Sequence, residues 1–248
     1  PRIVFFGTED WFFLSHRLNL GRACLAKGWR VTVAARVRNH DDEIISEGFR
    51  LAPIPLRRGG MNPVHELRTL FSIFRVFAKE KPDIVHLVGL KLILYGSLVA
   101  LFFPGTIVIN AVSGLGTLFT SDQKKTSLVR KAILFAFPRL LKRKNSWVIV
   151  QNRDDEAFFQ DMALPGRVVL VPGSGVDLEQ FSPMPEPEGV VTAAIVSRML
   201  GEKGINEVAA AARILKERGV TIQIQLVGAP DPENPSSIPE ETLRGWHA

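Results

Sequence analysis

The sequence predicts an α/β fold in which helices cover a parallel sheet, followed by the beginning of a second, similar unit. Three observations predict it. Short β-branched runs alternate with longer segments of helical periodicity over the first 180 residues. The same alternation starts again near residue 190, after a stretch rich in proline and glutamate. The chain has 248 residues, of which 46% are hydrophobic and 23% charged, so it can bury a core like an ordinary globular protein.

The first unit carries the longer series of elements. A strand is expected at 2–6, and a helix at 12–27 that Gly28 ends. The prolines of the expected strand 49–56 place it at a sheet edge. The other expected elements are strand 30–36, helix 64–80, strand 83–88, helix 91–103, strand 106–112, helix 126–144, strand 147–151, helix 154–162 and strand 167–172. This spacing is typical of βαβ units, which build parallel sheets.

The second unit follows the segment "FSPMPEPEG" (181–189), which has the composition of an interdomain linker. A strand at 191–196, a helix at 204–218 and a strand at 221–228 are expected after it. We therefore expect an N-terminal Rossmann-like domain over 1–180, and a linker with an incomplete C-terminal Rossmann-like domain over 181–248. Two strands and one helix would leave one face of their sheet exposed, so we expect the chain to be a fragment of a longer protein.

Composition limits the possible partners. Lys and Arg exceed Asp and Glu by 31 to 25, which favours an anionic partner such as a nucleotide, a lipid phosphate or a nucleic acid. The lone Cys24 excludes an internal disulfide, and with five scattered histidines it forms no zinc pattern, so no metal site is expected. The N-terminus lacks the pattern of a signal peptide, and the apolar run 90–103 is too short to cross a bilayer.

The loops after the strands carry the first candidate site residues, because ligands of open α/β sheets bind at the carboxyl ends of the strands. Glu9 could hydrogen-bond a sugar hydroxyl, and Asp10 could either contact substrate or cap the following helix. His86, in the fourth strand, could orient a hydroxyl or accept a proton, or it could be a buried structural histidine.

Further candidates follow the fifth strand, where Ser113 offers a hydroxyl and Gly114 and Gly116 allow close approach of the backbone to a ligand. The sequence contains neither a G-x-G-x-x-G dinucleotide fingerprint nor a Walker P-loop. Hydride transfer and nucleotide hydrolysis are therefore disfavoured, and with them a nicotinamide-dependent oxidoreductase on the same fold class.

The second unit has a basic loop between its first strand and its helix. Arg198 and Lys203 lie in this loop, and Gly204 stands where the helix begins. Free N–H groups and the positive end of a helix dipole attract anions, so two cations beside them make a place for phosphate. The alternative is a solvated turn with two surface cations.

Residues 124–144 contain eight cations and no acids, interleaved with Leu, Ile and Phe. A basic amphipathic helix of this kind suits the headgroup layer of an anionic membrane, at roughly 1 kcal/mol per cation near the surface. The alternatives are a solvated basic face and a nucleic acid site. We do not expect nucleic acid, because aromatic stacking positions and nucleic-acid-binding motifs are missing.

Several motifs together resemble the retaining glycosyltransferases of GT-B architecture, and within them glycosyltransferase family 4. They are "SRMLGEKGINEVAAAARILKERG" (197–219) with "IQLVG" (224–228), "PGSGVDLEQFSP" (172–183) and "KPDIVHL" (81–87). Four more are similar to bacterial enzymes that extend sugars on undecaprenyl-diphosphate carriers: "TEDWFFLSHRL" (8–18), "GLKLILYG" (89–96), "SGLGTLF" (113–119) and "VGAPDPENPSSIPEETLRGW" (227–246).

The resemblance implies roles for these residues. Arg198 and Lys203 match the cations that hold the donor diphosphate and stabilise charge on the leaving nucleotide, without metal or cofactor. The implied donor is a nucleoside-diphosphate sugar, UDP-linked, and the implied acceptor is a lipid-linked saccharide met by the loops that carry Glu9, Asp10, His86 and Ser113 to Gly116. The basic helix 124–144 would then rest on the inner, cytoplasmic face of the bacterial cell membrane.

The sequence departs from the family pattern in three places. The paired glutamates that grip the donor sugar are expected beyond residue 248, the first loop has "GTED" where many members have a glycine pair, and "VSGLG" (112–116) lacks the family's histidine. We therefore expect this chain to be inactive alone, with its acceptor-side catalytic group unassigned. The alternative is a non-catalytic membrane-binding module on a Rossmann-like scaffold, which would have no use for Arg198 and Lys203.

Overall fold

The computed structural model describes residues 1–57, 62–114, 135–234 and 236–246. Gly116 and the first part of the predicted helix 126–144 lie outside these ranges. The chain divides into two compact units, Pro1–Val176 and Asp177–Ala248, and each is described by itself. The predicted linker of 181–189 falls in the second unit and close to its start.

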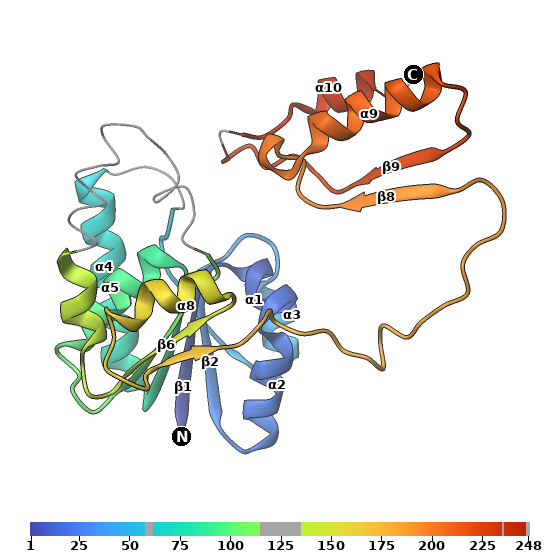
Figure 1. Cartoon of the computed structure of the whole chain (residues 1–248). Coiled ribbons are helices and arrows are strands. Elements are labelled where there is room, and N and C mark those ends of the chain that lie inside the picture. Colours follow the sequence, from blue (N-terminus) through green and yellow to red (C-terminus); the bar gives the residue numbers. More distant parts are fainter. Residues whose placement is uncertain (58–61, 115–134, 235, 247–248) are drawn as a thin grey trace. The chain divides into compact units, whose positions relative to one another are not determined.

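In the described residues, unit 1 contains a seven-stranded sheet in the order β3-β2-β1-β4-β5-β6-β7 (Figure 1). Every pair of neighbouring strands is parallel, as the sequence predicts. The proline-containing β3 lies at an edge, also as predicted. The strands are β1 (Arg2–Glu9), β2 (Arg30–Arg36), β3 (Arg50–Pro53), β4 (Ile84–Val88), β5 (Ile107–Ala111), β6 (Ser146–Val150) and β7 (Val168–Leu170).

Helices cover both faces of this sheet. One core joins Phe5 and Val33 of the central strands to α1 (Asp10–His16), α2 (Leu18–Ala26) and α3 (Asp41–Ser46). The other joins Phe6 and Leu87 to α4 (Pro63–Glu80), α5 (Leu90–Ala100), α8 (Arg153–Gln160) and the helical residues 135–141. Figure 1 shows α1 and α2 on one side of the sheet and α4 and α5 on the other. Because successive side chains of a strand point to opposite faces, the nearly continuous apolar β1 feeds both cores.

Two local features of unit 1 differ from the sequence prediction. The single helix expected at 12–27 is two helices that meet at Arg17, whose φ of −132° and ψ of −2° are not helical. Its periodicity hides the break, because no proline or glycine marks it. The helix α3 was not predicted, since its six residues bury only Ile44 and are too few to show a period.

Unit 2 contains two parallel strands, β8 (Thr192–Val196) and β9 (Gln223–Val227). They are connected by the short 3₁₀ helix η1 (Gly201–Lys203) and by α9 (Ile205–Glu217), and α10 (Glu240–Gly245) follows. Strands and helix lie within two residues of the predicted bounds, whereas η1 and α10 were not predicted. The buried core is small, with Met199, Ile205 and Ile238 at its centre. Val196 is 78% exposed, so part of the sheet is uncovered, as expected for two strands and one long helix.

Candidate functional site

The strand order defines where a ligand site is expected in unit 1. The chain runs from β1 outward through β2 to β3 and then returns to place β4 on the other side of β1. In open α/β sheets, ligands bind outside the carboxyl ends of the strands at such a reversal. The loops that follow β1 and β4, together with the neighbouring loop after β5, are therefore the candidate site of this unit.

Glu9 ends β1 and lies beneath a basic loop. Its carboxylate is 1% exposed, with Oε2 3.1 Å from Arg38 Nε and Oε1 3.7 Å from Arg36 Nη1. The parallel pairing of β1 with β2 brings these three residues to the same edge. Contact between Glu9 and a sugar stays a prediction, and the structure shows the side chain enclosed by cations of the β2 end.

Asp10 is fully buried and organises the loop after β2. Its Oδ2 accepts hydrogen bonds from the backbone N–H groups of Arg38 at 2.7 Å, and of Asn39 and His40 at 3.1 Å each. Its Oδ1 accepts from the Trp11 N–H at 2.8 Å. Burial acts to raise the pKa of Asp10, but these four backbone bonds outweigh it, so the pKa is lowered.

The helix-capping role considered for Asp10 is wrong, because Glu9 is the N-cap of α1 and Asp10 is the first helical residue. The N-cap Glu9 provides no side-chain cap, and of the first-turn N–H groups Asp10 accepts only that of Trp11. The Asp10 carboxylate instead supports a loop that lies 28 to 30 residues further along the chain. Contact of Asp10 with substrate stays a prediction.

His86 lies two residues before β4 ends and is 4% exposed. Its ring is beside that of Phe5, with centroids 5.3 Å apart. Arg17 Nε donates a hydrogen bond to its Nε2 at 3.2 Å, which places the ring proton on Nδ1. Burial, and secondly the charge of Arg17, lower the pKa of His86 to about 3. His86 is thus neutral near pH 7, and its Nε2 is already an acceptor for Arg17.

Arg17 was not among the predicted site residues. Its Nη1 donates to the His16 carbonyl at 2.8 Å and to Ser174 Oγ at 2.9 Å, while Nε donates to His86. The motif "PGSGVDLEQFSP" (172–183) was expected at the domain junction, and its Ser174, which belongs to unit 1, contacts Arg17 just before the start of α2. No sequence pattern could show this contact, because it joins residues 157 positions apart.

The loop after β5 carries Ser113 and Gly114, next in the sheet to the end of β4. Ser113 is exposed and makes no hydrogen bond to another described residue. Gly114 has a φ of +129°, a backbone conformation that other residues rarely adopt. Gly116, the third residue predicted here, lies outside the described ranges. The substrate contacts proposed for this loop stay predictions.

The carboxyl edge of unit 2 collects the other predicted residues. Arg198 follows β8, and its Nη1 lies 2.7 Å from Oδ2 of Asp231, which follows β9. Lys203 is exposed at the end of η1, and Gly204, with a φ of +75°, is the N-cap of α9 and gives it no side-chain cap. The N–H groups at the start of α9 therefore lie close in sequence to both cations, an arrangement that suits phosphate. No local pattern predicts that Asp231 pairs with Arg198, because the two residues are 33 positions apart.

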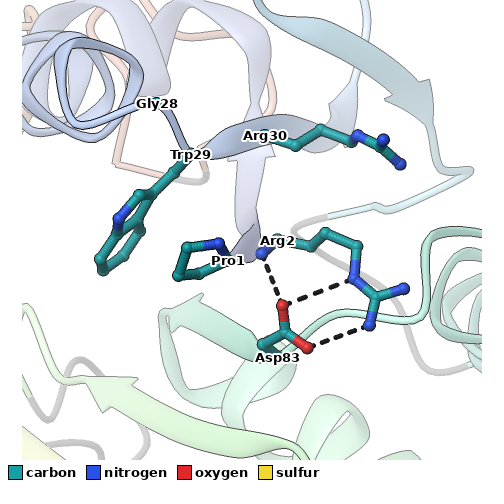
Figure 2. Close-up of a pocket in the computed structure, with 6 residues that line it drawn as sticks. All are labelled: Pro1, Arg2, Gly28, Trp29, Arg30 and Asp83. Carbon is teal, nitrogen blue, oxygen red and sulfur yellow. Dashed lines mark hydrogen bonds and ion pairs between the residues drawn. The ribbon is translucent and has the colours of Figure 1, made fainter.

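A separate hollow of about 510 Å³ lies at the opposite, amino edge of the unit 1 sheet (Figure 2). Arg2 dominates it, with Nη2 3.0 Å from Asp83 Oδ1 and its backbone N–H 2.7 Å from Oδ2. Figure 2 shows Trp29 and Arg30 on the side of Pro1 and Arg2 that faces away from Asp83. Since this carboxylate is already paired and the edge is the wrong one for a Rossmann-like ligand, the hollow is not part of the candidate site.

The described part of the predicted basic helix borders an apolar groove. Residues 135–141 are helical, and with α4 and α5 they line a hollow of about 580 Å³ that includes Leu67, Leu98 and Phe135. Side chains there and nearby are unusually exposed for their type: Leu67 67%, Phe71 64%, Phe102 72% and Phe135 65%. In the described residues, no helix combines the length and the apolar character that a bilayer span requires.

Fold and sites together define a GT-B protein: a Rossmann-like unit with candidate residues at its carboxyl edge, then a second unit with cations at a helix start. Among solved structures, sucrose-phosphate synthase from Thermosynechococcus elongatus matches with a TM-score of 0.71 at 18% identity, over 99% of this chain and 66% of its own. A glycosyltransferase from Rickettsia africae matches with a TM-score of 0.62 at 14% identity, over 91% and 68%. The predicted fold class is confirmed.

The chain belongs to the glycosyl transferase 4-like family, whose model matches residues 2–152. It is 26% identical over 144 residues to the UDP-Gal:alpha-D-GlcNAc-diphosphoundecaprenol alpha-1,3-galactosyltransferase of Escherichia coli, covering 57% of this chain and 35% of the relative. It is 23% identical over 210 residues to the N,N'-diacetylbacillosaminyl-diphospho-undecaprenol alpha-1,3-N-acetylgalactosaminyltransferase of Campylobacter jejuni, covering 79% and 54%. These matches confirm the resemblance drawn from the motifs and do not favour a non-catalytic module. The aligned part is about a third to a half of each curated relative's length.

Proposed function

We propose that this protein is a retaining glycosyltransferase that transfers a hexose or N-acetylhexosamine from a UDP-linked sugar to a lipid-linked saccharide in cell-surface glycan synthesis. Family membership supports glycosyl transfer. The names of both curated relatives support a diphosphoundecaprenol-linked acceptor, and one of them names UDP-Gal as donor. The observation that carries the proposal is that Arg198 and Lys203 lie in the loop that leads into α9, whose N-cap Gly204 provides no side-chain cap.

The proposed chemistry needs positive charge where the donor diphosphate departs. As the bond between the anomeric carbon and the diphosphate breaks, negative charge grows on the diphosphate, and fixed cations stabilise it. Asp231 binds one guanidinium nitrogen of Arg198, while Nη2 makes no hydrogen bond to a described residue. Lys203 and the first N–H groups of α9 would meet the same diphosphate, so no metal is needed for this step.

Replacing Arg198 by alanine is expected to lower turnover at least tenfold, or about 1.4 kcal/mol in transition-state stabilisation. Transfer from UDP-sugars to a short-chain polyprenyl-diphosphate-linked N-acetylglucosamine, followed by mass spectrometry, measures this in the full-length protein. Arg213→Ala is the matched control, because Arg213 lies exposed on α9 and pairs with no described carboxylate. Full turnover in Arg198→Ala would remove this residue from the mechanism.

We also propose that the basic segment 124–144 and the neighbouring apolar groove hold the enzyme on the cytoplasmic face of the membrane. Four cations, Arg139, Lys142, Arg143 and Lys144, follow Phe135 in the described part of this segment, with no acid among them. They suit anionic headgroups, while exposed Leu67, Phe71 and Phe102 suit the acyl region beneath. The site would thereby be presented to a lipid-linked sugar.

Substituting Arg139, Lys142 and Lys144 by glutamine is expected to weaken binding to vesicles containing phosphatidylglycerol at least tenfold. Each cation near such a surface contributes about 1 kcal/mol, so three exceed that threshold. Sedimentation with vesicles measures the effect, which should shrink at high salt. Glutamine at Arg213, Lys216 and Arg218 of unit 2 changes the charge equally and serves as control. Equal losses in both triple variants would mean that net charge alone, and not this segment, governs binding.

A further inference from the structure

Arg17 is a partly buried cation without an acidic partner among the described residues. Five other arginines around the unit 1 sheet have an acidic partner: Arg2 with Asp83, Arg22 with Glu47, Arg36 and Arg38 with Glu9, and Arg50 with Glu80. By contrast, the described carboxylates leave Arg17 without an ion pair, and burial lowers its pKa. Removing a cation from water without pairing it costs free energy, so its position calls for a physical reason.

The groups that hold Arg17 are neutral and leave its charge uncompensated. His86 Nε2, Ser174 Oγ and the His16 carbonyl oxygen accept its hydrogen bonds. Together they fix the guanidinium through Nε and Nη1, while Nη2 bonds to no described residue. A guanidinium that is fixed in this way is ready to donate to an anionic oxygen without paying further ordering entropy.

The place of this cation in the fold is where a ligand is expected. His86 is paired in register with Phe5 of β1, so Arg17 faces the β1–β4 strand pair at which the strand order reverses. The break between α1 and α2 falls at Arg17 itself, and the Arg17 side chain bonds His86 of β4. Ser174 brings the segment after β7 to the same point. Three separate parts of unit 1 therefore converge on one charged group.

We propose that Arg17 binds a phosphate oxygen of a substrate, with His86 and Ser174 as the residues that position it, so that unit 1 has its own contact to a diphosphate. A planar guanidinium matches phosphate oxygens well. The choice of phosphate over carboxylate rests on the proposed function, in which donor and acceptor both carry a diphosphate. The two sources share one chemistry, and binding experiments distinguish them.

The test measures binding of two probes to the 248-residue chain by calorimetry: UDP for the donor, and farnesyl diphosphate for the lipid-linked acceptor. Arg17→Gln removes the charge but keeps an N–H donor for His86. This substitution is expected to lower the binding affinity for at least one of the two probes tenfold or more. If only the affinity for farnesyl diphosphate falls, Arg17 contacts the acceptor. If only the affinity for UDP falls, Arg17 contacts the donor. Arg17→Lys keeps the charge but lacks the planar guanidinium, so its affinity for the same probe should lie between those of the unsubstituted chain and Arg17→Gln.

Arg22→Gln is the matched control, since Arg22 is an exposed arginine on the neighbouring helix and pairs with Glu47. It should leave both affinities unchanged. Unaltered binding of both probes to a folded Arg17→Gln, or no binding of either probe to the unsubstituted chain, overturns the proposal. If UDP binding falls in Arg198→Ala but neither probe responds to Arg17→Gln, the proposed function stands and only the role of Arg17 falls.

Discussion

Asp10→Ala is expected to destabilise unit 1 by about 3 kcal/mol or more. The carboxylate is 0% exposed and accepts hydrogen bonds from four backbone N–H groups, at distances of 2.7 to 3.1 Å. Alanine leaves these donors without an acceptor, and each buried unsatisfied donor costs about 1 to 3 kcal/mol. The loop can relax toward water and recover part of this loss, so the estimate stays near the lower end of the sum.

Urea unfolding followed by tryptophan fluorescence measures the loss, because Trp11, Trp29 and Trp147 report on unit 1. Asp161→Ala is the control: Asp161 is exposed at the end of α8, and its removal should change stability by less than about 0.5 kcal/mol. Asp10→Asn keeps one carbonyl oxygen for the 38–40 loop and should fall between. A loss below about 1 kcal/mol in Asp10→Ala would show that the loop is held mainly by other contacts.

If Asp10 is structural, the acidic pair Glu9 and Asp10 of the first loop is not where the acceptor binds, and other residues must contact it. Glu9 and Asp10 both turn toward the end of β2, where their charges meet Arg36, Arg38 and backbone amides. His86 gives its free nitrogen to Arg17 and is no ready general base. Arg17, whose Nη2 bonds to no described residue, then offers a charged donor beside the β1–β4 reversal.

The sheet could be predicted from the sequence because buried positions recur at regular intervals and are occupied by apolar residues. The alternation of Phe5 and Phe6 between two cores, and the repeat of apolar residues over 64–80, are local patterns that fix element type and rough bounds. The same argument predicted that Lys203 and Gly204 stand just before the helix 204–218, and the structure has them directly before α9, while Arg198 lies earlier in the loop after β8. Residues whose positions follow from a local sequence pattern could therefore be placed from the sequence alone.

Partners of charged side chains were not predictable, since nothing local records them. Asp10 bonds 28 to 30 residues ahead, Arg198 bonds 33 ahead, and Arg17 bonds across 69 and 157 residues. Each of these contacts depends on which strands become neighbours. The break at Arg17 was also not predictable, because it coincides with no proline or glycine, and the partner of Arg17 on β4 is distant in sequence. A parallel sheet hides such contacts more than a hairpin does, since its neighbouring strands are far apart in sequence.

Acid is expected to destabilise unit 1 through His86, and the sign follows from proton binding. The ordinary pKa of histidine is 6.5, whereas in the folded protein burial and Arg17 lower the pKa of His86 to about 3. Above pH 6.5 the ring is neutral in both states and contributes no pH dependence. Between pH 6.5 and about 3 the unfolded chain binds a proton that the folded chain does not, so stability falls as pH falls.

Each pH unit in that window costs up to about 1.4 kcal/mol, so about 2 to 3 kcal/mol should be lost between pH 6.5 and ~4.5. His86→Gln removes the titrating group while its amide oxygen can still accept from Arg17, so its unfolding free energy should fall less over the same range. Other acids and histidines titrate equally in both proteins and cancel in the difference. Urea unfolding at several pH values measures the two slopes. Equal slopes would mean that His86 takes up its proton in the folded protein as readily as in the unfolded chain. A protonated Nε2 cannot accept the hydrogen bond from Arg17 Nε. In that case His86 would not position Arg17 for a phosphate.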